Sequence, residues 1–200
     1  SSLLIDISLH LGSLLAIIYF FRQDLFDLKN NQKLLKLMII GSIPLFIFGY
    51  ILHSSELIYN VRNIKIIAWT TLIFGIVLYF ADQRKTDQNI STSLNVRSII
   101  FIGLLQILAL IPGVSRAGIN MTAARFLRFN RVDAGKISFL LSIPALAGAG
   151  FLGLINIPNE SLELNLLVIV AIILSFLFSY FTVKFFLSFI NRFSLKIFVI

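Results

Sequence analysis

The chain has 200 residues, of which 58% are hydrophobic and 13% charged, and its mean hydropathy is +0.95. A soluble domain of this size needs more charge to cover its surface, so the composition predicts an integral membrane protein. The sequence has no cysteine and only two histidines, which excludes disulfides, thiol catalysis and cysteine-type zinc sites. The net charge of +8 comes from short basic stretches between apolar blocks. This pattern orients membrane proteins, so we expect membrane lipids and no nucleic acid as partners.

Apolar spans recur along the chain, and each approaches the length of about 20 residues that a helix needs to cross a bilayer. Backbone groups in lipid must pair within their own segment, so we expect these spans to be helices. Pro44 and Pro144 lie inside spans, and each is expected to kink its helix. The predicted fold class is an all-α polytopic membrane protein. The spans cover residues 3–21, 34–53, 64–81, 97–112, 137–157 and 164–190.

A weak internal repeat runs through the sequence at an offset of 130 residues. Ile7-Ser8 recurs as Ile137-Ser138, and the spacing Ile-x-x-Phe-x-Phe-x-Tyr begins at both Ile43 and Ile173. Apolar sequences match by chance, so the shared spacing is the stronger part of this evidence. We predict one transmembrane domain, truncated at both ends, with these bounds: the whole domain 1–200, the first repeat 1–81 and the second repeat 97–200.

The charge distribution predicts how residues 97–127 are threaded. If they enter the membrane and return, one side of the membrane collects almost all the basic segments, namely 22–36, 82–97, 125–136 and 191–196. The other side then keeps only Arg62, Lys65 and the acidic loop 158–163. A single crossing would put the basic segment 125–136 outside. The positive-inside rule therefore favours an inverted-topology repeat with a re-entrant helical hairpin whose basic side is cytoplasmic.

The segment Pro-Gly-Val-Ser-Arg-Ala-Gly at residues 112–118 has the residue types of an anion site. Pro112 and Gly113 break the helix at the end of an apolar span, Ser115 can cap a second helix, and Arg116 then lies in its first turn. A helix start offers free N–H groups and the positive end of the dipole, and arginine adds a planar fork that can hold two phosphate oxygens. An arginine at membrane depth costs about 2.5 kcal/mol or more, so it usually faces a cavity or a partner.

Residues beyond Arg116 extend this segment. Gly118 leaves room for close approach, while Asn120 and Thr122 either line the pocket or pack against neighbouring helices. The chemistry alone leaves an equal alternative, which is an ordinary Pro-Gly turn at the membrane surface with Arg116 reaching toward the headgroups. Three further arginines, Arg125, Arg128 and Arg131, are expected to be cytoplasmic anchors, with contact to lipid phosphate as the alternative.

The stretch from Gln106 to Thr122 resembles the second signature of the undecaprenyl-diphosphate phosphatase family, the bacitracin-resistance proteins. That signature is usually Pro-Gly-x-Ser-Arg-Ser-Gly followed by a small residue and Thr. Residues 137–145 resemble the helix that follows it, and residues 5–16 resemble the first full span of the family. Two positions depart from the pattern, because Ala117 and Ile119 stand where the family usually has small polar residues.

The first signature of the family, a Glu-x-x-x-Glu pair followed by Pro-Val-Ser-Ser-Thr-Gly-His, is absent from these 200 residues. The repeat places the counterpart of Ser115 about 15 residues before Ser1, by the 130-residue offset, so we interpret the loss as truncation. The family uses the missing residues as nucleophile or base and as ligands of a divalent cation, Mg²⁺ or Ca²⁺. The chain alone is therefore expected to be inactive.

The resemblance implies hydrolysis of undecaprenyl diphosphate to undecaprenyl phosphate, which recycles the lipid carrier of peptidoglycan synthesis in the bacterial plasma (inner) membrane. A polyprenyl diphosphate lipid is the expected substrate, and a homodimer is left open. A lipid or anion transporter (a flippase) on the same scaffold and an inactive fragment are the alternatives. The resemblance implies catalytic roles for Arg116 and Ser115, and substrate contacts for Pro112, Gly113, Gly118, Asn120 and Thr122.

Overall fold

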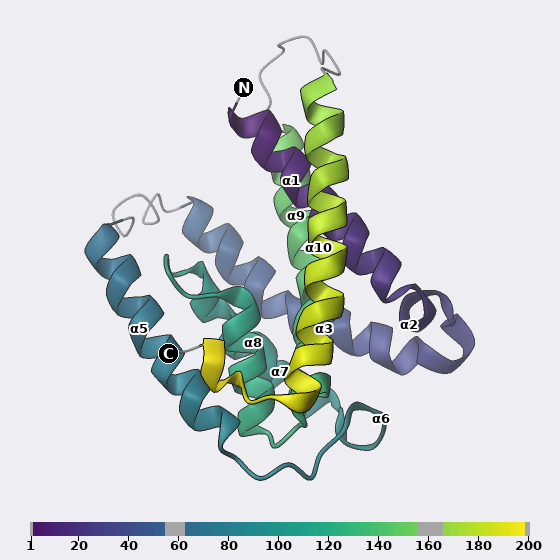
Figure 1. Cartoon of the computed structure of the whole chain (residues 1–200), viewed down its shortest axis with the longest axis vertical. Helices are drawn as coiled ribbons and strands as arrows, with labels where there is room; N and C mark the ends of the chain where they lie inside the picture. Colours follow the sequence, from purple (N-terminus) through teal and green to yellow (C-terminus); the bar gives the residue numbers. More distant parts are fainter. Residues whose placement is uncertain (1, 55–62, 156–165, 199–200) are drawn as a thin grey trace. The chain divides into compact units, whose positions relative to one another are not determined.

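The computed structural model describes residues 2–54, 63–155 and 166–198 (Figure 1). These residues form helices and the segments that connect them. The β-structure among the described residues is one isolated β-bridge between Gln88 and Phe129. The acidic loop 158–163 and Arg62, which entered the charge argument, lie outside the described residues. The helices in chain order are α1 (Ser2–Phe20), α2 (Arg22–Phe26), α3 (Leu28–Ser54), α5 (Ile64–Asp82), α6 (Ile90–Ser93), α7 (Val96–Gln106), the 3₁₀ turn η1 (Ile107–Leu110), α8 (Arg116–Phe126), α9 (Arg131–Ile155), α10 (Leu166–Arg192) and the 3₁₀ turn η2 (Leu195–Phe198).

Four described helices are long and apolar enough to cross a membrane. Large apolar side chains remain exposed along them, including Ile47 on α3, Leu72 on α5 and Phe178 on α10. Exposure of so many apolar side chains to water is unfavourable, whereas contact with lipid tails carries no such cost. The prediction of an all-α polytopic membrane protein is therefore confirmed. The four candidate spans are Asn31–Leu52, Ile64–Asp82, Arg131–Phe151 and Val168–Arg192.

The chain divides into two compact units, and each contains residues from both predicted repeats. Unit 1 comprises residues 1–32 and 143–188, and unit 2 comprises residues 33–142 and 189–200. In unit 1, the hydroxyl of Ser13 on α1 lies 3.1 and 2.9 Å from the hydroxyls of Ser175 and Ser179 on α10. Small polar residues of this kind let two helices approach closely and bond to each other inside a membrane. The repeat itself stays a prediction.

Unit 2 contains a helical hairpin made of α7, η1 and α8. Ile99 in the first turn of α7 and Ile102 at its middle share a buried cluster with Ala123 and Ala124 near the end of α8. The two helices therefore run antiparallel and in contact (Figure 1). The turn between them falls at η1 and the signature segment.

The segments that enter and leave the hairpin bond to each other. The backbone N–H groups of Asp87 and Gln88 donate to the carbonyl of Arg128, and the N–H of Asn130 donates to the carbonyl of Gln88. The segment before α7 and the segment after α8 thus lie side by side, and residues 97–127 go in and come back. The predicted helical hairpin is confirmed, and a single crossing by this stretch is excluded.

The helices differ from the predicted spans in two ways, each with a physical reason. The span 97–112 is not one helix, because α7 ends at Gln106, four residues form a 3₁₀ turn, and the backbone then opens before Pro112. Conversely, α9 begins at Arg131, six residues before the predicted span at 137. The carboxamide oxygen of Asn130 accepts the N–H of Asp133 at 2.8 Å and so caps this polar first turn. Hydropathy marks the apolar part of a helix, whereas the cap marks its start.

Close contact between α3 and α7 fixes the hairpin within unit 2. A Cβ added to Gly103 would collide with the backbone carbonyl of Gly41, and one added to Gly41 would lie 2.7 Å from Ile99 Cγ1. The two helix backbones therefore touch at this pair of glycines, which is the contact that small residues permit in membranes.

Candidate active site: the tip and base of the hairpin

The signature segment forms the tip of the hairpin and the start of α8. Ser115 is the N-cap of α8, and its Oγ accepts the N–H of Gly118 at 3.2 Å. Arg116 is the first residue of the helix. The predicted cap and the predicted place of Arg116 in the first turn are both confirmed. Helix geometry leaves the N–H groups of Arg116 and Ala117 without a partner inside the helix, so they are available to an anion.

Helix α5 holds the tip in place. Thr70 Oγ1 donates to the carbonyl of Pro112 at 2.7 Å, and Thr71 Oγ1 donates to the carbonyl of Gly113 at 3.0 Å. Gly113 has a φ of +92°, and a Cβ there would collide with Thr70 Oγ1 and lie 2.6 Å from the carbonyl oxygen of Ile67. Only glycine satisfies both the positive φ and the close approach of α5. Pro112 and Gly113 therefore shape the tip through their backbones.

Arg116 and Asn120 stand four residues apart in α8, and therefore on one face of that helix. Arg116 is half-buried, and its Nε is buried without a hydrogen-bond partner. Asn120 is fully buried, and neither its Oδ1 nor its Nδ2 makes a hydrogen bond. A guanidinium and a carboxamide with unused donors, next to a helix start, form an arrangement suited to phosphate.

The remaining signature residues serve the helix itself in this structure. A Cβ on Gly118 would lie 3.3 Å from the Cβ of Ser115, so this glycine makes room for the cap. The hydroxyl of Thr122 donates to the carbonyl of Gly118 at 2.8 Å. The carbonyl of Ala117 accepts the hydroxyl of Ser138 on α9, and Ile119 is buried. Of the two residues that depart from the signature, Ile119 is therefore packed inside the unit, whereas the side chain of Ala117 is exposed. Substrate contact by Gly118 and Thr122 stays a prediction.

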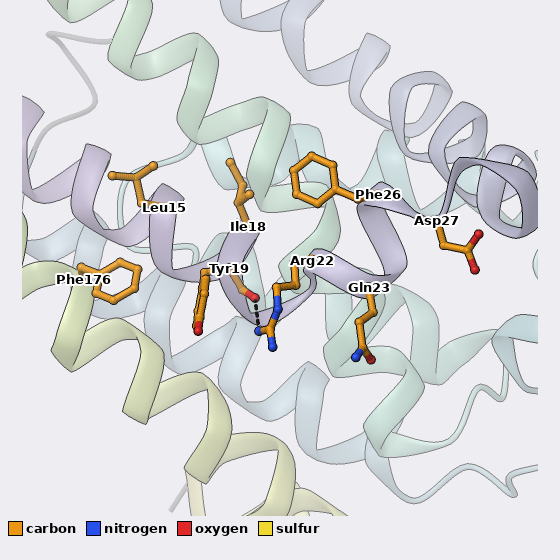
Figure 2. Close-up of a pocket in the computed structure, with 8 residues that line it drawn as sticks. All are labelled: Leu15, Ile18, Tyr19, Arg22, Gln23, Phe26, Asp27 and Phe176. Carbon is orange, nitrogen blue, oxygen red and sulfur yellow. Dashed lines mark hydrogen bonds between the residues drawn. The ribbon is translucent and has the colours of Figure 1, made fainter.

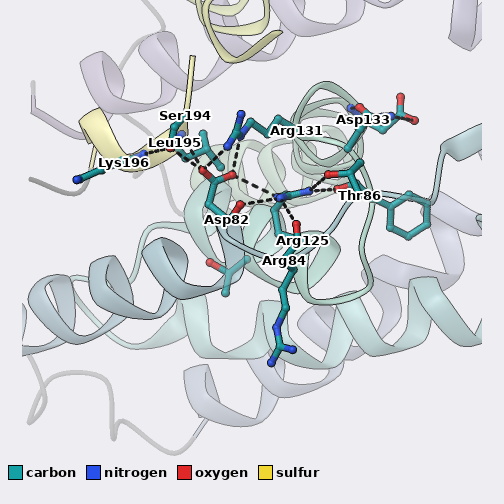
Figure 3. A network of polar contacts seen from close by, with 12 residues as sticks. Asp82, Arg84, Thr86, Arg125, Arg131, Asp133, Ser194, Leu195 and Lys196 are labelled. Atoms are coloured by element: carbon teal, nitrogen blue, oxygen red, sulfur yellow. Dashed lines mark hydrogen bonds and ion pairs between the residues drawn. The ribbon is translucent and has the colours of Figure 1, made fainter. Parts of the chain in front are cut away.

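A network of charges at the base of the hairpin was not expected from the sequence (Figure 3). Asp82, the last residue of α5, is buried and accepts hydrogen bonds from Arg131 Nε at 2.8 Å and Arg131 Nη2 at 3.0 Å. It also accepts the hydroxyl of Ser194 at 2.8 Å and the N–H of Leu195 at 3.1 Å. One carboxylate thereby ties the end of α5 to the start of α9 and to the segment after α10.

The prediction that Arg125 is a cytoplasmic anchor is wrong. Its side chain is only 2% exposed, and its Nε lies 3.3 Å from Asp82 Oδ1. Its guanidinium donates to the carbonyls of Asp82, Arg84 and Phe129. A buried charge needs such partners, and here they come from two segments that meet at the base, the end of α5 with the residues just after it and the residues after α8. Arg128, in contrast, is exposed and pairs with exposed Asp87 at 2.8 Å, and its role as a cytoplasmic anchor stays a prediction.

Sequence reasoning passed over the two elements that hold the hairpin. Asp82 directly follows an apolar span and was not identified as a site residue. A single acid among several basic segments is nevertheless a signal of a buried ion pair. Thr70 and Thr71 were hidden inside the same span, although two adjacent hydroxyls in an apolar helix call for acceptors. Both signals were present in the printed sequence.

An apolar groove lies in unit 1, on the turn between α1 and α2 (Figure 2). Its volume is about 940 Å³, and it is lined by Leu15, Ile18, Tyr19, Arg22, Gln23, Phe26, Asp27 and Phe176. Arg22 stacks over the ring of Tyr19 at 4.5 Å and donates to the Tyr19 carbonyl. None of the predicted site residues lines this groove.

The divalent cation implied by the resemblance needs carboxylate or other oxygen ligands. Within the described ranges, no group of three or more His, Asp, Glu or Cys side chains is placed to hold a metal ion. The tip offers the guanidinium of Arg116 with the hydroxyl of Ser115 and the carboxamide of Asn120 instead. A positive charge without a carboxylate beside it suits an anion, so these residues do not fit a cation site.

The fold defines a multi-pass α-helical membrane protein, and the capped start of α8 with Arg116 has the chemistry of an anion site. The model of the family "Bacitracin resistance protein BacA" matches residues 1–200. The chain belongs to this family.

Named relatives agree with the family. The chain is 65% identical to an undecaprenyl-diphosphatase of Pelagibacter ubique (strain HTCC1062) over 201 residues, which covers 100% of this chain and 78% of the relative. It is 37% identical to an undecaprenyl-diphosphatase of Alteromonas mediterranea and 35% identical to one of Elusimicrobium minutum. Those two matches cover 98% of this chain and 78% and 77% of the relatives. The resemblance that began with the second signature thus extends over the whole sequence.

Proposed function

We propose that the protein hydrolyses undecaprenyl diphosphate to undecaprenyl phosphate and phosphate in the bacterial plasma (inner) membrane, and so recycles the lipid carrier of peptidoglycan synthesis. The family and the names of the relatives support the reaction. The observation that supports its assignment to particular residues is the N-terminus of α8. This helix start is capped by Ser115, and Arg116 is its first residue at the tip of the hairpin.

In this proposal, the terminal phosphate of the lipid lies at the start of α8. The N–H groups of the first turn and the guanidinium of Arg116 bind its oxygens. The Ser115 Oγ accepts the backbone N–H of Gly118, which leaves its own O–H free to donate to a phosphate oxygen. Hydrolysis adds water across the bond between the terminal phosphorus and the bridging oxygen. Arg116 then stabilises the charge that builds on the transferred phosphoryl group and on the leaving phosphate.

The hairpin accounts for binding and charge stabilisation, and the proposal leaves activation of the attacking water to residues of the family's first signature. The divalent cation remains part of the proposal through the resemblance, with ligands that the described residues do not supply. The homodimer left open by the resemblance is tested by the mass of the purified protein in detergent.

The test uses the complete protein that contains this sequence, purified in detergent with undecaprenyl diphosphate as substrate. We expect phosphate release by the wild type and a loss of about a hundredfold or more in Arg116→Ala, the usual effect of removing a transition-state donor. Arg128→Ala is the matched control, because Arg128 is exposed and lies at the base. Full turnover by Arg116→Ala would contradict the assigned role. Movement of the lipid across vesicles without phosphate release would favour the transporter alternative.

A further inference from the structure

Buried polar atoms without hydrogen bonds are concentrated at the tip of the hairpin. Among the described residues, such atoms belong to the side chains of Gln106, Arg116, Asn120 and Arg125. The Arg125 Nε is explained by its ion pair with Asp82 at 3.3 Å. The remaining three side chains all lie between residues 106 and 120, on the two helix ends that flank the turn.

Elsewhere in unit 2, buried hydroxyls are paired. The hydroxyl of Ser42 on α3 donates to the Met38 carbonyl at 2.9 Å. Thr122 and Ser138 likewise donate to carbonyls at 2.8 and 3.1 Å. An unpaired buried amide costs about 1–3 kcal/mol, so two of them in one small region need a reason. The rest of the unit demonstrates that this fold can satisfy buried polar groups.

Gln106 is the less expected of the two carboxamides. It is fully buried, and both its Oε1 and its Nε2 lack a partner. It is the last residue of α7, directly before the turn. Because α7 and α8 run antiparallel, the last turn of α7 lies level with the first turns of α8, where Arg116 and Asn120 stand. The three unpaired groups therefore belong to one end of the hairpin.

A carboxamide is a suitable second donor for a buried diphosphate. It donates hydrogen bonds to phosphate oxygens without adding another buried charge, which would carry a larger desolvation cost. A diphosphate also presents more acceptor oxygens than one guanidinium and a helix start can satisfy. We propose that Gln106 is a further diphosphate-binding residue, which together with Asn120 donates hydrogen bonds to the substrate beside Arg116. This inference rests on the proposed function and extends the same site by a residue outside its signature.

The experiment compares Gln106→Leu, which is similar in size but apolar, with the wild type of the complete protein. Four quantities are measured: the melting temperature without substrate, KM for undecaprenyl diphosphate, kcat for the same substrate, and the affinity for inorganic pyrophosphate. We expect Gln106→Leu to melt at the same temperature or higher, because it removes an unpaired polar group, and to raise KM about tenfold. The control is Ser42→Ala, which removes a buried but paired hydroxyl on α3 and should leave KM unchanged.

A purely structural Gln106 would give the opposite result. Gln106→Leu would then keep the wild-type KM and the wild-type pyrophosphate affinity, and that outcome overturns the inference. If Gln106→Leu does not fold, Gln106→Glu tests the same inference. Its negative charge should repel the diphosphate, so we expect folded Gln106→Glu to bind pyrophosphate more weakly than the wild type. Wild-type pyrophosphate affinity in Gln106→Glu would overturn the inference. Failure of the proposed function appears separately, as wild-type protein that binds pyrophosphate through Gln106 but releases no phosphate from the lipid.

Discussion

Removal of the Asp82 carboxylate is the most informative perturbation of the base of the hairpin. In Asp82→Ala, the buried charge of Arg125 loses its ion partner, and Arg131 loses both of its hydrogen bonds to the carboxylate. Breaking a buried ion pair from one side costs about 3–5 kcal/mol. The N–H of Leu195 also loses its acceptor, which adds to this cost. Since a typical domain is stable by about 5–15 kcal/mol, this change should bring the protein close to unfolding.

The matched control is Asp87→Ala at the other ion pair of the base. Its partner Arg128 lies at 2.8 Å, closer than Arg125 lies to Asp82, but both side chains are about half exposed, at 50% and 43%. Exposed pairs contribute about 0–1 kcal/mol, so this variant should be close to the wild type. By distance alone, the pair of Asp87 with Arg128 would contribute more to stability than the pair of Asp82 with Arg125. Burial reverses this order, because the second pair is shielded from water.

Both variants are measured by equilibrium unfolding in detergent micelles. Trp69, the one tryptophan of the sequence, lies on α5 and reports on the same helix that carries Asp82. We expect the free energy of unfolding of Asp82→Ala to fall by at least about 2 kcal/mol more than that of Asp87→Ala. Equal stabilities of the two variants would refute the assignment of Asp82 as the junction of the base.

Further predictions concern the tip. Gly113→Ala should lower both the melting temperature and phosphate release, because the positive φ and the contact with α5 exclude a Cβ; unchanged behaviour of both would contradict the close approach. Ser115→Ala should lose about 1 kcal/mol of stability and part of the turnover, while Ser115→Thr should keep both, as measured by thermal unfolding and phosphate release. Removal of divalent cations by a chelator should stop phosphate release and added Mg²⁺ or Ca²⁺ should restore it, and turnover that continues in the chelator argues against a cation.

The fold followed from the sequence because the physics of lipid is restrictive. Apolar length predicts helices, and the imbalance of charge predicts that residues 97–127 return to the side from which they came. The cap of α8 was also predictable, because Ser115 directly follows a helix break and precedes Arg116. These features depend on neighbouring residues or on average composition, which a single sequence contains.

The base of the hairpin could not be predicted in the same way. Arg125 looks like Arg128 in the sequence, since both are arginines in one basic segment, yet the first is buried and the second exposed. The difference is set by Asp82, which stands 43 residues earlier and meets Arg125 only once the chain has folded. The unpaired amide of Gln106 is invisible for the same reason, because the absence of a hydrogen bond is a property of packing.

The return of residues 97–127 to their side of entry is the claim on which the site depends, and cysteine labelling tests it directly. The chain has no cysteine, so Lys85→Cys, Arg128→Cys and Lys65→Cys each place one thiol in these residues, the first two at the base and the third at the opposite end of α5. A membrane-impermeant maleimide is applied separately to right-side-out and to inside-out membrane vesicles. We expect positions 85 and 128 to react from the same side of the membrane and position 65 to react from the other side. Reaction of position 128 from the side of position 65 would contradict it.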